Sequence, residues 1–207
     1  MSLLIPFLDA VGSDITTPES VVLLGDSTIT SQACRTETIA EILFTPTEQS
    51  QGWSAHNLAV GGHTINDQLA VWNAYANKTD HDIIIIQVGL NNMGANISDT
   101  LSQYQNLVNT VNSTKKAGAK VFISCMLPCK QRWVDLGMMP GAQSNWVALN
   151  NAIMTTITGV NKRNDYHVSL LDDGSGNLAA AYDCGDHIHE NLAGAEIIRD
   201  GFRLMIF

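Results

Sequence analysis

The sequence predicts an α/β protein built on a five-stranded parallel sheet with helices on both faces. Short apolar runs without polar alternation recur along the chain, which is typical of strands buried on both faces. Stretches with apolar residues at helical spacing separate these runs, and Gly, Pro or Asp residues follow the runs. Strands that alternate with helices in this way form parallel sheets.

The five predicted strands share an apolar, largely β-branched character. They cover residues 21–24, 56–60, 82–88, 120–124 and 166–171. The run Asp-Ile-Ile-Ile-Ile-Gln-Val at 82–88 is the strongest of them, because β-branched residues favour strands. Since the runs are short and have no polar face, we expect all five to lie in one covered sheet.

Four stretches predict helices: residues 65–76, 98–117, 142–157 and 191–205. The clearest period is that of 98–117, with Lys115 and Lys116 in its last turn and Gly118 after it, as is usual at a helix C-terminus. No repeat, low-complexity tract or linker interrupts the pattern, so we expect residues 1–207 to form a single domain.

Composition narrows the range of partners. Only 15% of the 207 residues are charged, and 11 Lys and Arg against 20 Asp and Glu give a net charge of −9. Nucleic acids and anionic membranes demand a basic face, so neither is expected as the main partner. No apolar run reaches the ~20 residues of a membrane helix. The first 14 residues lack a basic residue and a clear cleavage site, so no signal peptide is predicted. We expect a soluble protein, and the sequence leaves its compartment and oligomeric state open.

Polar residues and glycines follow the first two predicted strands. The first ends in Gly25-Asp26-Ser27-Thr28. A serine that follows a buried strand and opens a helix has its N–H at the positive end of the helix dipole, and its hydroxyl is a nucleophile where a base is near. Capping the helix is the alternative role of Ser27. The second strand ends in Gly61-Gly62, which lets a backbone N–H point into a cleft or forms a tight turn.

Two further segments carry candidate chemistry. The third strand ends in Gly89-Leu90-Asn91-Asn92, where a side-chain amide either donates to a developing oxyanion or forms an Asx turn. After the fifth strand, Asp186 and His189 are three residues apart. In a turn, that spacing lets the carboxylate meet Nδ1 of the imidazole and leaves Nε2 free to act as a base.

The segment 183–191 also supports a second interpretation, a metal site. Zinc and manganese bind imidazole and carboxylate groups, and His-x-His is a ligand spacing. The candidate ligands are Asp183, Asp186, His187, His189 and Glu190. No second cluster of ligands stands out elsewhere in the sequence, so we favour a site without metal or other cofactor.

Together these four segments resemble the SGNH hydrolase (GDSL-like lipase/esterase) family. Its four blocks are carried, in chain order, by Gly25-Asp26-Ser27, Gly62, Gly89-Leu90-Asn91 and Asp186-His187-Ile188-His189. The resemblance extends from residue 21 to the last helix. It implies a three-layer α/β/α sandwich of flavodoxin-like type and hydrolysis of an ester. The first block has Thr28 where Leu is common, and Glu190 stands where members often carry proline, which predicts a less rigid loop.

The resemblance also implies a role for each matching residue. Ser27 is the nucleophile, His189 the general base, and Asp186 the residue that orients His189. The N–H of Ser27, the N–H of Gly62 and the side chain of Asn91 form the oxyanion hole. His187 lies next to His189, and the three-residue spacing from Asp186 favours His189 as the base.

We therefore expect a serine ester hydrolase that forms an acyl-enzyme with short acyl groups, with carbohydrate O-acetyl esters as the favoured substrates. A lipase, an acyl thioesterase or an acyltransferase with the same triad is an alternative. So are a metal-dependent hydrolase and a non-catalytic carbohydrate-binding domain, although the latter predicts a broken triad. The stretch 125–140 contains Trp133, three methionines and two prolines. It either walls the acyl pocket as a lid or packs in the core.

The four cysteines are Cys34, Cys125, Cys129 and Cys184. They are too few for a disulfide framework and include no C-x-x-C pair, so free thiols are expected and one structural disulfide is the alternative. A bridge between the stretch 125–140 and Cys184 stays open, because connectivity cannot be read from a sequence.

Overall fold

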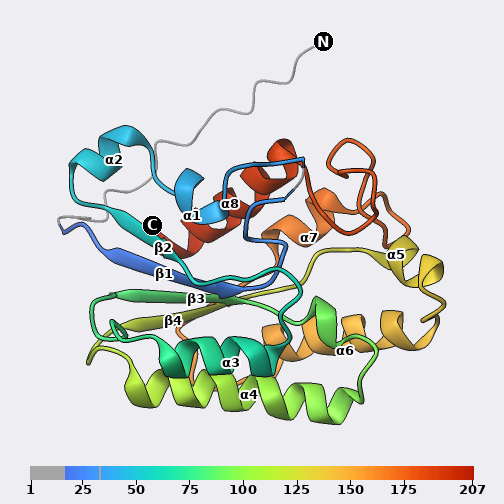
Figure 1. The fold of residues 1–207 in the computed structure, drawn as a ribbon, viewed down its shortest axis with the longest axis horizontal. Coiled ribbons are helices and arrows are strands. Elements are labelled where there is room, and N and C mark those ends of the chain that lie inside the picture. The colour runs from blue at the N-terminus through green and yellow to red at the C-terminus, as the bar shows by residue number, and fades with distance from the viewer. Residues whose placement is uncertain (1–16, 33) are drawn as a thin grey trace.

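A computed structural model describes residues 17–32 and 34–207, and one parallel sheet forms its centre (Figure 1). The strand order is β2-β1-β3-β4-β5, with every neighbouring pair parallel. The strands are β1 (Ser20–Gly25), β2 (Ser54–Asn57), β3 (Ile83–Gln87), β4 (Lys120–Ser124) and β5 (Lys162–Asn164). This is the flavodoxin-like order, which confirms the predicted fold class.

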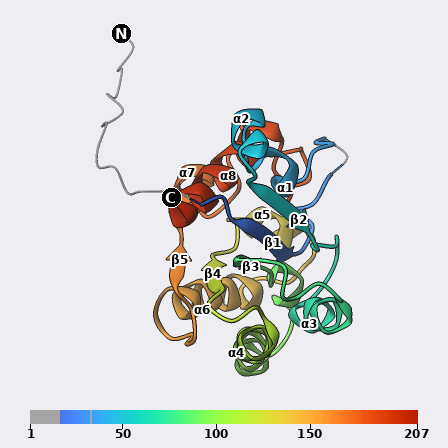
Figure 2. The same ribbon diagram turned by 90° about the vertical axis from the view of Figure 1, so that its left-hand side faces the viewer.

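Helices cover both faces of the sheet, so the structure has three layers (Figures 1 and 2). One layer holds α3 (Ile65–Ala74), α4 (Ile97–Thr114) and α6 (Gly141–Thr155). The other holds α1 (Ile39–Ile42), α7 (Tyr166–Leu171) and α8 (Leu192–Ile206), with α2 (Pro46–Ser50) beside them. The short helices η1 (Leu90–Asn92) and α5 (Lys130–Asp135) follow β3 and β4.

The central strands form the core that fixes the sheet register. All five residues of β3 are fully buried, and Val21 to Leu24 of β1 are equally inaccessible. The register pairs Val21 with Ile83 and Leu24 with Ile86. Strands covered on both faces need apolar residues at every position, which is why their sequence shows no alternation.

The predicted fifth strand at 166–171 is wrong. These residues form helix α7, and the fifth strand is the preceding Lys162–Asn164. In α7, His167 and Leu171 are buried four residues apart, which is helical spacing that a six-residue window does not separate from a strand. A short edge strand needs few apolar residues, so Lys-Arg-Asn gives no strand signal.

The second strand is shorter than the predicted run 56–60. It ends at Asn57, whose side chain accepts a hydrogen bond from the N–H of Ala59 at 3.0 Å. The chain beyond Asn57 still follows β1, because the N–H groups of Leu58 and Val60 donate to the carbonyls of Leu23 and Gly25. This Asx turn begins the loop that carries Gly62.

The N-terminal segment 1–14, for which the sequence predicts no signal peptide, lies outside the described residues. Within residues 17–32 and 34–207, no helix has the length and apolar character needed to span a membrane. In a sheet of this order, the carboxyl ends of β1 and β3 border the crevice where the strand order reverses. Ligands of such folds bind in that crevice.

Buried His167 makes the stability of the fold depend on pH. Its Nε2–H donates to the Cys125 carbonyl at 2.9 Å, and burial lowers its pKa from 6.5 to about 4. Between these two values the unfolded chain binds a proton that the folded chain does not. We expect acidification from pH 6.5 to pH 4 to reduce the free energy of unfolding by about 3 kcal/mol through this residue.

Denaturant titrations of the wild type and of His167→Gln across this pH range check the expectation. Glutamine does not titrate, and its amide N–H keeps a donor for the Cys125 carbonyl. The variant should lose this part of the pH dependence, and parallel stability curves for the two proteins would show that His167 does not cause it.

Candidate active site

Strand β1 brings Ser27 to the carboxyl edge of the sheet. Gly25, the last residue of β1, has no room for a side chain, because a Cβ there would lie 2.6 Å from the Gln87 carbonyl oxygen and even closer to the side chain of Ile29. The N–H of Gly25 donates to the Gln68 side chain at 3.1 Å. Glycine is therefore required where β1, β3 and the turn that holds Ser27 meet.

Asp26 holds the turn from inside. Its carboxylate is fully buried and accepts hydrogen bonds from the N–H and the hydroxyl of Thr28 at 3.1 and 2.9 Å, and from the N–H of Gly89 at 3.3 Å. Burial raises the pKa of Asp26, and these hydrogen bonds oppose the shift. Asp26 thus joins the end of β1 to the end of β3 and leaves the side chain of Ser27 free to face the opposite way.

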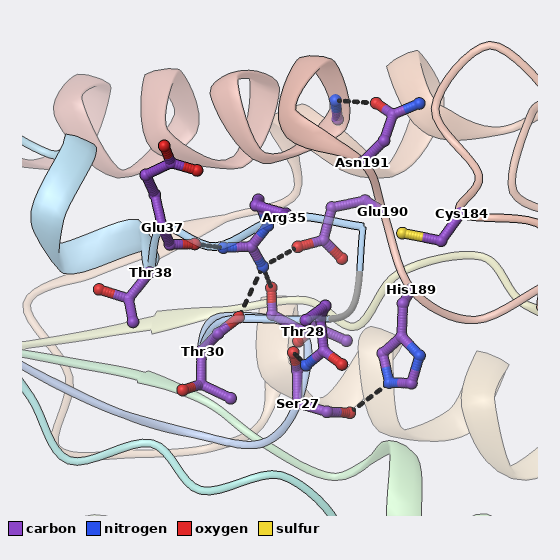
Figure 3. A network of polar contacts seen from close by, with 12 residues as sticks. Ser27, Thr28, Thr30, Arg35, Glu37, Thr38, Cys184, His189, Glu190 and Asn191 are labelled. Atoms are coloured by element: carbon purple, nitrogen blue, oxygen red, sulfur yellow. Dashed lines mark hydrogen bonds and ion pairs between the residues drawn. The ribbon is translucent and has the colours of Figure 1, made fainter.

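The structure brings Ser27, His189 and Asp186 together in a hydrogen-bonded series. Ser27 Oγ lies 2.9 Å from His189 Nε2, as Figure 3 shows. On the other side of the ring, His189 Nδ1 lies 2.5 Å from Asp186 Oδ2. The Asp186 carboxylate thereby selects the tautomer in which Nδ1 carries the proton and Nε2 accepts from the serine hydroxyl.

The loop before α8 holds Asp186 as an anion. Its Oδ1 accepts the N–H groups of His189 at 2.9 Å and of Ile188 at 3.2 Å. Partial burial acts to raise the pKa of Asp186, but these hydrogen bonds and the His189 imidazole outweigh it and lower the pKa below its usual value. Asp186 is therefore ionised at neutral pH, as an orienting carboxylate must be.

The oxyanion hole expected from the sequence uses the N–H groups of Ser27 and Gly62 and the side-chain amide of Asn91. Within residues 17–32 and 34–207, the backbone N–H groups of Ser27 and Gly62 have no hydrogen-bond acceptor and are therefore available as donors. Gly62 has φ +80°, a conformation that glycine adopts without strain. Asn91 Nδ2 donates to the carbonyl of His63 at 3.0 Å, which fixes its amide beside the Gly62 turn and leaves its second N–H available.

Substitution of the two neighbouring asparagines, Asn91 and Asn92, should affect different properties, kcat in one case and stability in the other. Asn91 is exposed, whereas Asn92 is buried and its side chain accepts the N–H of Ile65 at the start of α3. We expect Asn91→Ala to lower kcat by about 10²–10³ with little change in stability, because it removes one donor of the oxyanion hole that the sequence predicts. Asn92→Ala should instead reduce the free energy of unfolding by about 1–3 kcal/mol, because it leaves a buried N–H unpaired.

Initial-rate kinetics and thermal unfolding of these two variants measure both effects. Equal kcat losses in the two variants would contradict the separate roles.

The loop before α8 contains a second carboxylate–imidazole pair, Asp183 and His187, that the sequence did not reveal. Asp183 Oδ2 lies 2.9 Å from His187 Nδ1, and Asp183 Oδ1 accepts the N–H of His187. His187 has φ +65° and its side chain is 47% exposed. Its ring is held by Asp183, whereas the ring next to Ser27 is that of His189.

The predicted metal ligands do not converge. In the described part of the chain, no three His, Cys, Asp or Glu side chains are grouped as metal ligands. Asp183 pairs with His187, Asp186 with His189, and Glu190 is buried against Arg35. The five candidate ligands of the sequence are thus divided among three separate contacts.

A pocket of about 480 Å³ opens beside His189. The described residues that line it are Gln32, Cys34, Cys184, Gly185, Asp186 and His189. None of them comes from the stretch 125–140, for which the sequence left open a wall of the acyl pocket or packing in the core. That stretch packs into the core at Leu127 and at Trp133, and Trp133 is the buried residue of α5.

The disulfide pairing differs from the expectation. Cys34 and Cys184 form a disulfide with their Cα atoms 5.8 Å apart, and Cys125 and Cys129 are free and buried. The expectation of free thiols is therefore wrong for Cys34 and Cys184, which form the one structural disulfide named as the alternative, and the bridge to the stretch 125–140 that the sequence left open is not formed. Burial raises the pKa of the Cys125 thiol to about 12, so this thiol stays protonated and unreactive.

The fold and this site define an α/β protein with the Ser–His–Asp arrangement that serine hydrolases use. The model of the GDSL-like lipase/acylhydrolase family matches residues 23–197, and the chain belongs to that family. No curated protein sequence matches the chain significantly.

Several solved structures share the fold. The lipase/acylhydrolase from Enterococcus faecalis superposes with a TM-score of 0.68 at 16% identity, over 91% of this chain and 95% of that one. An acetylxylan esterase from Geobacillus stearothermophilus gives 0.68 at 15% identity, over 93% and 96%. The esterase EstA from Pseudoalteromonas sp., inhibited by monoethylphosphonate, gives 0.61 at 16% identity, over 91% and 96%.

Proposed function

We propose that this protein is a serine ester hydrolase in which Ser27 is the nucleophile, His189 the general base and Asp186 the orienting carboxylate. The observation that carries the proposal is the series of two hydrogen bonds, 2.9 Å from Ser27 Oγ to His189 Nε2 and 2.5 Å from His189 Nδ1 to Asp186. A serine hydroxyl is a weak nucleophile on its own, and an adjacent base activates it.

Acylation uses each of these groups once. Ser27 Oγ attacks the acyl carbon while its proton passes to His189 Nε2, and the carbonyl oxygen becomes an oxyanion. The N–H of Ser27, the N–H of Gly62 and the amide of Asn91 stabilise that oxyanion. The tetrahedral intermediate collapses, the bond to the leaving oxygen breaks, and His189 gives its proton to that oxygen. The products of this half-reaction are an alcohol and an ester on Ser27.

Deacylation repeats the steps with water. His189 Nε2 takes a proton from the water as its oxygen attacks the acyl carbon, and the same three donors stabilise the second oxyanion. The bond from Ser27 Oγ to the acyl group then breaks, and His189 returns the proton to Oγ. A carboxylic acid leaves, and Asp186 stabilises the imidazolium in both steps without taking its proton.

We further propose short acyl groups as substrates, with acetyl esters on carbohydrate favoured. The pocket beside His189 is lined by Gln32, Gly185, Asp186 and the Cys34–Cys184 disulfide, and none of these residues has a long aliphatic side chain. The carboxylate of Asp186 and the amide of Gln32 can bind hydroxyl groups, whereas no run of aliphatic side chains is present to hold a lipid chain. The net charge of −9 disfavours polyanionic substrates and leaves neutral esters. An acetylxylan esterase is among the proteins that share the fold.

A series of 4-nitrophenyl esters from acetyl to octanoyl tests the acyl length. The rate should fall as the chain lengthens, and a rise toward octanoyl would support a lipase instead. Acetylated xylan and acetylated monosaccharides, compared with acyl thioesters, then test the leaving group. Each substrate is assayed with wild type and Ser27→Ala, so that only hydrolysis that needs Ser27 is counted.

A further inference from the structure

Two loops that carry catalytic candidates are tied to each other beside the Ser27–His189 contact. The first, residues 28–32 and 34–38, follows Ser27 and leads to α1, and the second, residues 183–190, contains His189 and leads to α8. The disulfide from Cys34 to Cys184 joins them covalently. One residue further along the first loop, Arg35 forms an ion pair with Glu190 of the second.

The Arg35 guanidinium contacts the neighbours of both catalytic candidates (Figure 3). Arg35 Nη2 lies 2.6 Å from Glu190 Oε1, and Glu190 directly follows His189. The same nitrogen donates to the carbonyl of Thr28 at 3.3 Å, and Thr28 directly follows Ser27. It also donates to the carbonyl of Thr30 at 2.8 Å. One rigid, planar group thus spans the distance between the two loops.

A contribution to the stability of the fold does not readily explain the Arg35–Glu190 pair. Both side chains are fully buried, and Arg35 Nε and Glu190 Oε2 have no hydrogen-bond partner in the described part of the chain. Burial raises the pKa of Glu190, and the charge of Arg35 opposes that shift. Replacing such a pair by uncharged residues of similar volume is often neutral or stabilising. The contacts of the pair with the residues that follow Ser27 and His189 indicate a role in positioning.

We propose that Arg35 and Glu190 are positioning residues that set the approach of His189 Nε2 to Ser27 Oγ. The proposal rests on the proposed function, because it assumes that this approach matters for catalysis. Arg35 fixes the positions of Thr28 and Glu190, the residues that directly follow Ser27 and His189. The disulfide keeps the two loops together when the ion pair is removed. A displacement of about 1 Å in a reacting pair costs roughly 10²-fold in rate.

The test uses two matched double variants. Arg35→Met/Glu190→Gln removes both charges of the buried pair with little change in volume. Arg203→Met/Glu48→Gln makes the same two substitutions in the ion pair that joins α8 to α2, where Arg203 Nη2 lies 2.7 Å from Glu48 Oε1. Glutamine at position 48 keeps the capping box of α2. Arg35→Lys is the third variant, which keeps the positive charge but loses the planar guanidinium with its several N–H donors.

We expect kcat for 4-nitrophenyl acetate to fall about 10²-fold in Arg35→Met/Glu190→Gln, with KM changed less than about twofold. In Arg35→Lys, kcat should fall about tenfold, because a lysine ammonium can contact only one of the two loops at a time. Arg203→Met/Glu48→Gln should keep the wild-type kcat. Thermal unfolding of all three checks that the chains are folded, and Arg35→Lys keeps the test decisive where the double variant is unstable.

A second readout needs no substrate. The Nδ1 proton of His189, in its short hydrogen bond to Asp186, gives a low-field proton NMR signal that His189→Ala identifies. The signal should shift or broaden in the Arg35 variants and stay in place in Arg203→Met/Glu48→Gln. A wild-type kcat and an unshifted signal in the folded Arg35 variants would overturn the proposal. If the wild type hydrolyses no ester, the proposed function fails, and the NMR signal still decides whether Arg35 positions His189.

Discussion

Ser27→Ala is expected to abolish ester hydrolysis while leaving the fold intact. Loss of the nucleophile from an assembled triad costs on the order of 10⁶ in kcat, and the remaining rate comes from the oxyanion donors and binding. Among the described residues the Ser27 hydroxyl has one hydrogen bond, to His189, so its removal breaks no other contact there. Thermal unfolding should stay within about 2 °C of the wild type.

Initial rates with 4-nitrophenyl acetate, measured at enzyme concentrations high enough to detect a residual rate, check this expectation. Thr28→Ser, which keeps a hydroxyl for the Asp26 carboxylate one position away, is the matched control and should retain most of the activity. A Ser27→Ala protein with more than a few per cent of wild-type kcat would show that the hydrolysis does not use this serine.

His189→Ala is expected to cause a comparable loss. Without the imidazole, no group accepts the Ser27 proton, and removal of the base costs about as much as removal of the nucleophile, on the order of 10⁶ in kcat. The backbone contacts of residue 189 do not depend on the side chain: its N–H donates to Asp186 and its carbonyl accepts the N–H of Cys184. The loop should therefore keep its shape.

His187→Asn is the matched control for this variant. Asparagine tolerates the positive φ of residue 187 better than alanine, and the His187 side chain is paired with Asp183 and not with Ser27. We expect His187→Asn to keep kcat within about threefold of the wild type, because it removes no donor or acceptor from Ser27. A large loss in His187→Asn together with a small one in His189→Ala would reverse the assignment of the base.

The strands could be predicted from the sequence where full burial requires an apolar residue at every position. The strands β1, β3 and β4 lie in the middle of the sheet, and their uninterrupted apolar runs were located to within two residues. The edge strands were harder, because an edge position does not demand apolar side chains. For that reason Lys162–Asn164 carries no strand signal, and the apolar residues of α7, which packs against α8, give a strand-like pattern in its place.

The candidate site could be predicted where chemistry and local geometry coincide. Asp186 and His189 lie in one turn, so their three-residue spacing was enough to expect their contact, and the structure places Ser27 beside them. The Arg35–Glu190 pair and the Cys34–Cys184 disulfide could not be read from the sequence. Each joins residues about 150 positions apart, as the 150-residue separation of the two cysteines shows, and no local pattern marks such partners.

The account depends most on Ser27 being a nucleophile that His189 activates, and labelling with an alkyl phosphonate tests this directly. Intact-mass spectrometry of the wild type should show one phosphonyl group, peptide mapping should place it on Ser27, and activity should fall in proportion to labelling. His189→Ala should label far more slowly, and His187→Asn at the wild-type rate. A phosphonyl group on another residue, or full activity in a protein whose Ser27 is labelled, would contradict the account.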